Sequence, residues 1–196
     1  DGAQALIGGG GDITVIDLRR RLPRRITFEL GNNLGPLWSS DSSRVIFNSN
    51  REDRWAVWSV DAAGRTPPVL VYKGDYSSYA SSTGPNNLVC FTEVHPDSGD
   101  NLWITDASGD ARPLVRSRYN EGSGAISHDG AWVAYQSDVS GRNEIYLIST
   151  SGTGTPLQIS AAGGRDPKWG PMGTSLYFRV GRAIMRIAIT DGRPAS

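Results

Sequence analysis

The sequence predicts an all-β protein that is built from a repeated four-stranded antiparallel sheet. Three observations lead to this fold class. Apolar residues occur in short runs of strand length, and no stretch shows helical periodicity with capping residues. The 196 residues include 24 Gly and 11 Pro, which is well above the usual share and indicates many turns. The third observation is an internal repeat of about 44 residues.

The repeat is clearest between residues 40–50 and 128–138, which lie 88 positions apart and align without a gap. A third copy lies between them, because Phe91 is 44 residues from both Phe47 and Tyr135. The repeating unit is therefore about 44 residues long.

Each unit is expected to contain four strands, A to D, in chain order. Strand A is short, ends at Trp38, Ile126 or Trp169, and is followed by a turn rich in Asp, Ser and Gly. Strand B is apolar at nearly consecutive positions, which is typical of a strand covered on both faces, whereas strands C and D alternate and are expected toward a wetter edge. The expected ranges are 44–48, 88–93, 132–137 and 175–180 for strand B, 55–60, 101–105, 144–149 and 182–189 for strand C, and 68–72, 112–116 and 155–159 for strand D.

Four antiparallel strands in about 44 residues are the dimensions of a β-propeller blade. One blade cannot bury both of its faces, so neighbouring blades must pack face to face, and most aromatic residues are expected to fill the gaps between them. Residues 35–74, 75–118 and 119–164 form three full blades of one domain. Residues 1–30 supply strands B to D of a partial blade, and residues 165–192 supply strands A to C of another, without room for a full strand D.

The two partial blades leave the closure of the ring open. The chain could be a piece of a larger propeller cut within a blade, a five-bladed ring with two incomplete blades, or a ring completed by two or more copies. An open arc would expose strand edges and apolar blade faces, which are association sites. The start at Asp1, without an initiator Met or a leader segment, also suggests an excised piece. We therefore expect excision or self-association rather than a self-sufficient monomeric ring.

Charge and composition exclude several classes of protein. The 20 Lys and Arg side chains balance the 20 Asp and Glu side chains, which argues against a dedicated nucleic-acid binder. No apolar run reaches the roughly 18 residues that cross a bilayer, so no membrane insertion is expected. Cys90 is the only cysteine, which excludes an intrachain disulfide and a thiolate metal cluster, and we expect it to be buried and inert.

No catalytic or cofactor-binding motif stands out. Residues 122–124 (Gly-Ser-Gly) lack the full nucleophile-elbow pattern and are expected in a connection between blades. His95 and His128 are expected to be solvated turn residues, and the four glycines at 8–11 a flexible hairpin. The acidic loop 97–100 has too few carboxylates for calcium and is expected to be a polar hairpin. We therefore expect no enzyme activity in this chain, no metal and no cofactor.

Binding is expected on the loops that connect strand D to strand A and strand B to strand C, because both sets crowd one face of a propeller and loops on rigid scaffolds carry function. The candidates mix charges, aromatic rings and amides, which suits a protein or peptide interface. They are Arg51, Asp53, Arg54, Tyr76, Tyr79, His95, Asp97, Arg118, Tyr119, Asn120, Glu121, Asp138, Arg142, Arg165 and Asp166. A basic run at 19–25, expected on a C-to-D turn, is either a solvated surface or a site for phosphates or an acidic protein.

The turns at residues 38–42 (Trp-Ser-Ser-Asp-Ser) and 126–130 (Ile-Ser-His-Asp-Gly) resemble the Trp-Ser-Pro-Asp-Gly turn of the TolB-like, WD-repeat-like β-propellers. The resemblance covers almost the whole chain. Ser40 and His128 stand where the family has Pro, and the middle copy lacks the Trp. Residues 120–146 are also similar to propellers attached to bacterial Ser/Thr protein kinases.

This resemblance implies a function without chemistry of its own. One hypothesis is a non-catalytic scaffold that binds a protein, peptide or small ligand through its loop face. The alternative is an accessory or sensor domain of a larger bacterial enzyme, such as a Ser/Thr kinase or a prolyl-oligopeptidase-like hydrolase. The family favours a periplasmic or other extracytoplasmic location, and a cytoplasmic one stays open.

Overall fold

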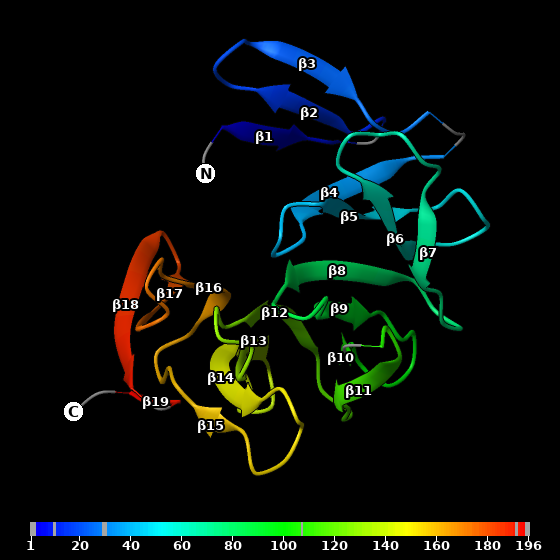
Figure 1. Ribbon diagram of the computed structural model, residues 1–196. Coiled ribbons are helices and arrows are strands. Elements are labelled where there is room, and N and C mark those ends of the chain that lie inside the picture. Colours follow the sequence, from blue (N-terminus) through cyan, green and yellow to red (C-terminus); the bar gives the residue numbers. More distant parts are fainter. Residues whose placement is uncertain (1–2, 10, 29–30, 107, 191, 195–196) are drawn as a thin grey trace. The chain divides into compact units, whose positions relative to one another are not determined.

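The computed structural model of the chain consists of β-strands joined by turns (Figure 1). It describes residues 3–9, 11–28, 31–106, 108–190 and 192–194. The described residues form 19 strands in five antiparallel sheets, and they include no helix. The chain divides into two compact units, Asp1–Ala80 and Ser81–Ser196, with the boundary inside strand β8 (Ser78–Thr83). A single propeller domain stays a prediction.

The Asp1–Ala80 unit contains two of the sheets. The three-stranded sheet consists of β1 (Gln4–Ile7), β2 (Thr14–Asp17) and β3 (Leu22–Arg25). The four-stranded sheet consists of β4 (Asn33–Trp38), β5 (Arg44–Ser49), β6 (Ala56–Asp61) and β7 (Val69–Tyr72). They share a core that includes Ile13, Val15, Val45, Phe47 and Trp58. Of the glycines expected to form a hairpin, Gly10 lies outside the described residues.

The Ser81–Ser196 unit contains the other three sheets, each with four strands in chain order. The first consists of β8, β9 (Val89–Glu93), β10 (Asn101–Thr105) and β11 (Ala111–Val115). The second consists of β12 (Glu121–Ile126), β13 (Trp132–Ser137), β14 (Glu144–Ser149) and β15 (Leu157–Gln158). The third consists of β16 (Arg165–Trp169), β17 (Ser175–Val180), β18 (Ala183–Thr190) and β19 (Arg193–Pro194), so its fourth strand is present but only two residues long.

The repeat places equivalent residues in equivalent environments. Phe47, Phe91 and Tyr135 are 0%, 0% and 2% exposed. Each pairs across its sheet with an aromatic residue of the following strand: Phe47 with Trp58, Phe91 with Trp103 and Tyr135 with Tyr146. The four-stranded propeller blade predicted from the 44-residue period is therefore confirmed.

The expectation that strand C lies toward a wetter edge is wrong for β6 and β14. Residues 56–60 of β6 and 144–148 of β14 are buried at every position. In these two sheets strand C lies between strands B and D, and other side chains cover both of its faces, whereas β18 of the last sheet is exposed at most positions. The solvated strand is D, as β7 and β15 show.

The Ser-x-Asp turn between strands A and B closes on its own side chains. Ser39 Oγ donates to Asp41 Oδ1 at 2.6 Å, and Ser127 Oγ donates to Asp129 Oδ1 at 2.5 Å. The same carboxylate oxygens accept the backbone N–H groups of Ser43 and Ala131, both at 3.0 Å. These side-chain bonds to the backbone are the physical reason for the motif.

The basic run at 19–25 is only partly in a turn. The Asp17 carboxylate accepts the backbone N–H groups of Arg19 and Arg20, at 3.0 and 2.9 Å, which closes the reversal early. The chain therefore re-enters the sheet at Leu22, and residues 22–25 belong to strand β3.

Residues 122–124 lie within strand β12, not in a connection between blades as expected. The strand bulges between Gly122 and Ala125, and Ser123 has a φ of 52°. A Cβ on Gly124 would lie 2.3 Å from Cys90 Sγ, so only glycine lets the strand approach the preceding sheet this closely.

The three sheets of the Ser81–Ser196 unit pack face to face. We call the side of a sheet that points to the next sheet in the chain its forward side, and the opposite one its backward side. Cys90, Leu102 and Ile104 on the forward side of the β8–β11 sheet pack on Val133 and Tyr135 on the backward side of the β12–β15 sheet. The forward side of that sheet packs in turn on the β16–β19 sheet, through Ala134, Ile145, Leu147, Leu176 and Phe178.

Candidate functional site

The loops predicted to bind a partner meet in pairs within each unit. In the Asp1–Ala80 unit, the loop between β5 and β6 contacts the loop between β7 and β8 through Lys73. The Lys73 Nζ lies 3.0 Å from Asp53 Oδ1 and 3.0 Å from Glu52 Oε2. The hydrogen bonds to Asp53 and then to Glu52 raise the pKa of Lys73. Arg54 Nη2 lies 3.5 Å from Asp53 Oδ2, so two basic side chains balance the two acidic ones and this part of the loop face is mainly a link between the two loops.

Two predicted arginines also hold the loops of this unit. The Arg51 guanidinium lies 4.6 Å from the centre of the Trp58 ring and donates from Nη2 to Asn33 Oδ1 at 3.1 Å. Arg54 donates to the backbone carbonyl of Gly74 at 3.4 Å. Both guanidinium groups therefore have structural partners within the unit.

Tyr76 and Tyr79 are half-buried on the adjoining loop and strand. The Tyr79 ring centre lies 5.9 Å from that of Trp55, within the range of a favourable aromatic contact. Together with Trp55, the two tyrosines give the loop face of this unit an aromatic portion.

In the Ser81–Ser196 unit, Asn120 joins two acidic loops. Its backbone N–H and Nδ2 donate to Asp138 Oδ1 and Oδ2 at 2.9 and 2.6 Å, and its Oδ1 accepts the Asp100 N–H at 3.3 Å. Burial, and then the nearby Asp138 charge, raises the pKa of Asp100. The structure thus brings together two predicted residues, Asn120 and Asp138, and adds Asp100.

Glu121 is buried directly beneath this cluster, with 2% of its surface exposed. Its Oε1 accepts the Ser117 hydroxyl at 2.6 Å, and its Oε2 has no hydrogen-bond partner within the described structure. Burial raises the pKa of Glu121, and the Asp138 charge adds to the effect. Glu121 is therefore buried below the loop face, with almost none of its surface open to solvent.

The other loop candidates are held locally. His95 Nδ1 accepts the backbone N–H groups of Asp97 and Ser98, both at 3.2 Å, so His95 is a turn residue as expected. Asp97 is exposed at the same turn. Arg118 lies 5.1 Å from the Tyr119 ring centre and donates to its hydroxyl at 2.9 Å.

Arg142 and Arg165 line one hollow on the loop face, which we call the arginine pocket. It has a volume of about 420 Å³. Arg179 is its third cation, and it forms an ion pair with Asp166 at 3.0 Å. The other lining residues are uncharged, and they are Asn143, Ala162, Gly163, Gly164, Val180 and Gly181. Two residues predicted separately thus share a site, which Arg179 completes.

A buried carboxylate holds one wall of the arginine pocket. Glu144 Oε1 lies 2.7 Å from Arg142 Nε, and Glu144 Oε2 accepts the Ser160 hydroxyl at 2.5 Å. The Arg142 Nη2 also donates to the backbone carbonyl of Ala161. The guanidinium of Arg142 is thus oriented before any ligand arrives.

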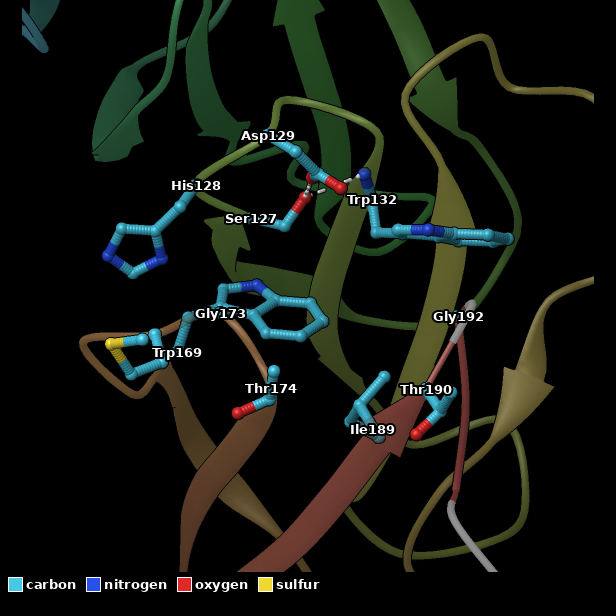
Figure 2. A pocket seen from close by; sticks show the side chains of 11 residues that line it. Ser127, His128, Asp129, Trp132, Trp169, Gly173, Thr174, Ile189, Thr190 and Gly192 are labelled. Carbon is cyan, nitrogen blue, oxygen red and sulfur yellow. Dashed lines mark hydrogen bonds between the residues drawn. The ribbon is translucent and has the colours of Figure 1, made fainter.

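A second pocket of about 380 Å³ lies at the turns between strands A and B, and the sequence analysis missed it (Figure 2). Figure 2 shows the indoles of Trp132 and Trp169 along its walls, with His128 and Asp129 at one end. Trp169 Nε1 donates to the Ala125 carbonyl at 2.9 Å. Both tryptophans also pack on the core, as predicted. Their place in the repeat indicated this packing but gave no sign that each side chain also lines a pocket.

The described residues offer neither a cluster of metal ligands nor a membrane-spanning helix. No group of three or more His, Cys, Asp or Glu side chains among them is arranged to hold a metal ion. None of the described segments is a helix of the length and apolarity that a membrane crossing requires.

The comparison with known proteins agrees with the repeat. The family model of the TolB β-propeller domain matches residues 4–173. The chain belongs to this family. No curated protein matches it.

Solved structures with the same fold include TolB proteins and enzymes. A putative TolB from Agrobacterium tumefaciens matches with a TM-score of 0.83 and 17% identity over 98% of this chain and 76% of that one. TolB from Acinetobacter baumannii matches with a TM-score of 0.74 and 16% identity, over 93% and 47%. A prolyl endopeptidase matches with a TM-score of 0.70 and 13% identity, over 100% and 33%. The TolB-like propeller thus occurs both in TolB proteins and as part of larger enzymes.

Proposed function

We propose that this TolB-like propeller is a non-catalytic scaffold that binds an acidic peptide segment of a protein partner on its loop face. The observation that carries the proposal is the arginine pocket, in which Arg142, Arg165 and Arg179 line one hollow of about 420 Å³. A guanidinium binds a carboxylate through two parallel hydrogen bonds, so such a pocket suits an Asp or Glu side chain or a peptide C-terminus.

The walls of the pocket support this proposal. Glu144 and the Ala161 carbonyl already hold Arg142, so less side-chain entropy is lost when a ligand binds. Gly163 and Gly181 leave room for a ligand to approach the backbone, because a Cβ on either would meet nothing closer than 3.8 Å. The acidic cluster of Asp100 and Asp138 lies on the same unit. It would repel an acidic ligand bound in the reverse orientation, so one orientation of the ligand is favoured.

The test uses a fluorescent hexapeptide of alternating Glu and Gly and the intact chain. Fluorescence anisotropy should show saturable binding that Arg142→Ala weakens by about tenfold, the effect of losing one charged pair. Arg118→Ala is the matched control, since Arg118 contacts Tyr119 on the loop face and does not line the pocket. Binding that does not saturate, or that responds equally to both substitutions, would exclude the pocket as the site.

A second candidate function is that of an accessory domain within a larger enzyme. It is favoured by the prolyl endopeptidase match, in which the similar region makes up 33% of the enzyme chain. Sequencing the reading frame on both sides of this chain tests it. A hydrolase or kinase domain in the same frame would support this candidate, and its absence would leave the scaffold function.

A further inference from the structure

The β16–β19 sheet has a forward side unlike those of the two preceding sheets of its unit. The strand registers allow equivalent cross-strand pairs of the three sheets to be compared. At one such position the pair is Cys90 with Ile104 in the first sheet, Ala134 with Leu147 in the second, and Tyr177 with Arg186 in the third. The first two pairs are at most 1% exposed and pack on the following sheet. In the third pair, Arg186 is exposed and Tyr177 is partly exposed.

The neighbouring row shows the same change. Thr92 pairs with Leu102, Gln136 with Ile145, and Arg179 with Ile184. Leu102 and Ile145 are fully buried, whereas Ile184 is 74% exposed. The side chain of Arg179 is 58% exposed. Three of these four positions are apolar and covered in the first two sheets, and in the third sheet they are charged or uncovered. The fourth position is Thr92 and Gln136 in the first two sheets and the exposed Arg179 in the third.

Strand β16 adds further positive charge to this side. Lys168 pairs with Tyr177, and Arg165 pairs with Arg179, so each shares the side of its partner. We call Lys168, Tyr177, Arg179, Ile184 and Arg186 the cationic sheet face. Figure 1 shows its central strands, β17 and β18, side by side.

The positive charge is local to this sheet. Residues 81–164 include nine acidic and four basic side chains, whereas residues 165–196 include two acidic and six basic ones. The acidic side chain next to the face, Asp166, is already paired with Arg179. The cationic sheet face therefore has a net positive charge although the chain as a whole has none.

These features limit what can cover the face. An apolar blade would leave Arg186 and Lys168 buried without a counter-charge, which is strongly unfavourable. Two copies of the face would repel each other. We propose that the cationic sheet face binds an acidic surface of another protein.

The composition of the face favours a protein over a nucleic acid. Tyr177 lies between Lys168 and Arg186 across the strands, and Ile184 lies beside Arg179, so two side chains that can be desolvated adjoin the cations. Tyr and Arg are both enriched in protein interfaces, in which an apolar centre is surrounded by a polar rim. This surface shares Arg179 with the arginine pocket, but Lys168 and Arg186 do not line that pocket and can be changed without altering its walls.

The test measures binding of the intact chain to immobilised poly-L-glutamate. Lys168→Glu combined with Arg186→Glu should weaken binding at least about tenfold. Arg19→Glu combined with Arg20→Glu reverses the same number of exposed charges in the other basic segment and should have little effect. The loss caused by Lys168→Glu with Arg186→Glu should persist when both proteins also carry Arg142→Ala, which separates this proposal from the arginine pocket. The milder Lys168→Gln and Arg186→Gln pair gives the same comparison if the first pair does not fold.

Three results would overturn the proposal. Equal losses of poly-L-glutamate binding in the two double variants would mean that binding depends only on the total charge of the chain. Tighter binding to a DNA duplex than to poly-L-glutamate would assign the face to nucleic acid. A solution mass of two or more copies that Lys168→Glu with Arg186→Glu reduces to one would assign it to self-association.

Discussion

Arg142 Nε lies 2.7 Å from Oε1 of Glu144, and this pair joins an exposed guanidinium to a carboxylate whose side chain is 1% exposed. The same carboxylate accepts the Ser160 hydroxyl at 2.5 Å and the Gly163 N–H at 2.9 Å. Burial alone would raise the pKa of Glu144, but the bonds from Ser160, Arg142 and Gly163 outweigh it and lower the pKa. One side chain thus fastens the β15–β16 loop to the start of β14.

Replacing Glu144 with Gln should reduce the free energy of unfolding by about 1–3 kcal/mol at neutral pH, because buried donors lose their charged acceptor. The pKa of Glu144 is lowered in the folded state, so its contribution is complete above the ordinary value of 4.5 and is lost as the pH falls below it. Urea unfolding at several pH values measures both effects. If the difference in the free energy of unfolding between the two proteins stayed constant, or grew, below pH 4.5, then Glu144 would not be stabilised as a carboxylate in the folded state.

Cys90 should not react with thiol reagents in the folded protein. It is 0% exposed, and burial raises the pKa of its thiol to about 12, so almost no thiolate is present at pH 8. Labelling with a chromogenic disulfide reagent should give no signal in buffer and one equivalent in guanidinium chloride. Rapid labelling without denaturant would show that the β8–β11 and β12–β15 sheets open easily.

Asp41 should remain ionised to unusually low pH. The Ser39 hydroxyl, followed by the N–H and hydroxyl of Ser43, lowers the pKa of Asp41 from 3.8 to about 2. Ser39→Ala should therefore raise this pKa toward 3.8, as measured by carboxyl NMR titration. Ser127→Ala is the control, since Ser127 bonds Asp129 and should raise the pKa of that residue alone.

Gly124→Ala should destabilise the protein by about 1–3 kcal/mol, because the new methyl group overlaps Cys90 Sγ at 2.3 Å and Leu102 Cδ1 at 2.9 Å. Gly9→Ala is a suitable control, as its Cβ would meet nothing within 4 Å. Adding Cys90→Ala to Gly124→Ala should restore part of the loss, which thermal unfolding of the single and double variants would show. Simple additivity of the two changes would contradict the close contact.

The repeat made the fold predictable, since equivalent aromatic residues recur at a fixed spacing and must pack in equivalent places. The spacing of Phe47, Phe91 and Tyr135 assigns them to one position of the blade from the sequence alone. The burial of strand C was missed because a single sequence shows which residues alternate but not which neighbouring sheet covers them. Residues 122–124 were wrongly expected in a connection between blades for a similar reason. A glycine is needed at 124 because the strand there approaches Cys90, a contact that the sequence does not reveal.

The candidate site was less predictable because its residues come from separate repeats. The spacing placed Arg142 and Arg165 on the loop face, but their common hollow depends on how two sheets pack. In the sequence, Glu144 is only the first residue of an expected strand. The structure shows that its side chain is buried, accepts hydrogen bonds from Ser160 and Gly163, and holds Arg142. Trp132 and Trp169 were expected in the core, and their partial exposure in a pocket leaves no signal in the repeat.

The separation of acidic residues 81–164 from basic residues 165–196 gives this half of the molecule an electric dipole. A dipole turns an approaching molecule before contact and thereby raises the rate of productive encounters rather than the lifetime of the complex. Since dissolved salt screens such fields over about 8 Å at physiological ionic strength, capture should slow steeply as salt is added while release changes little.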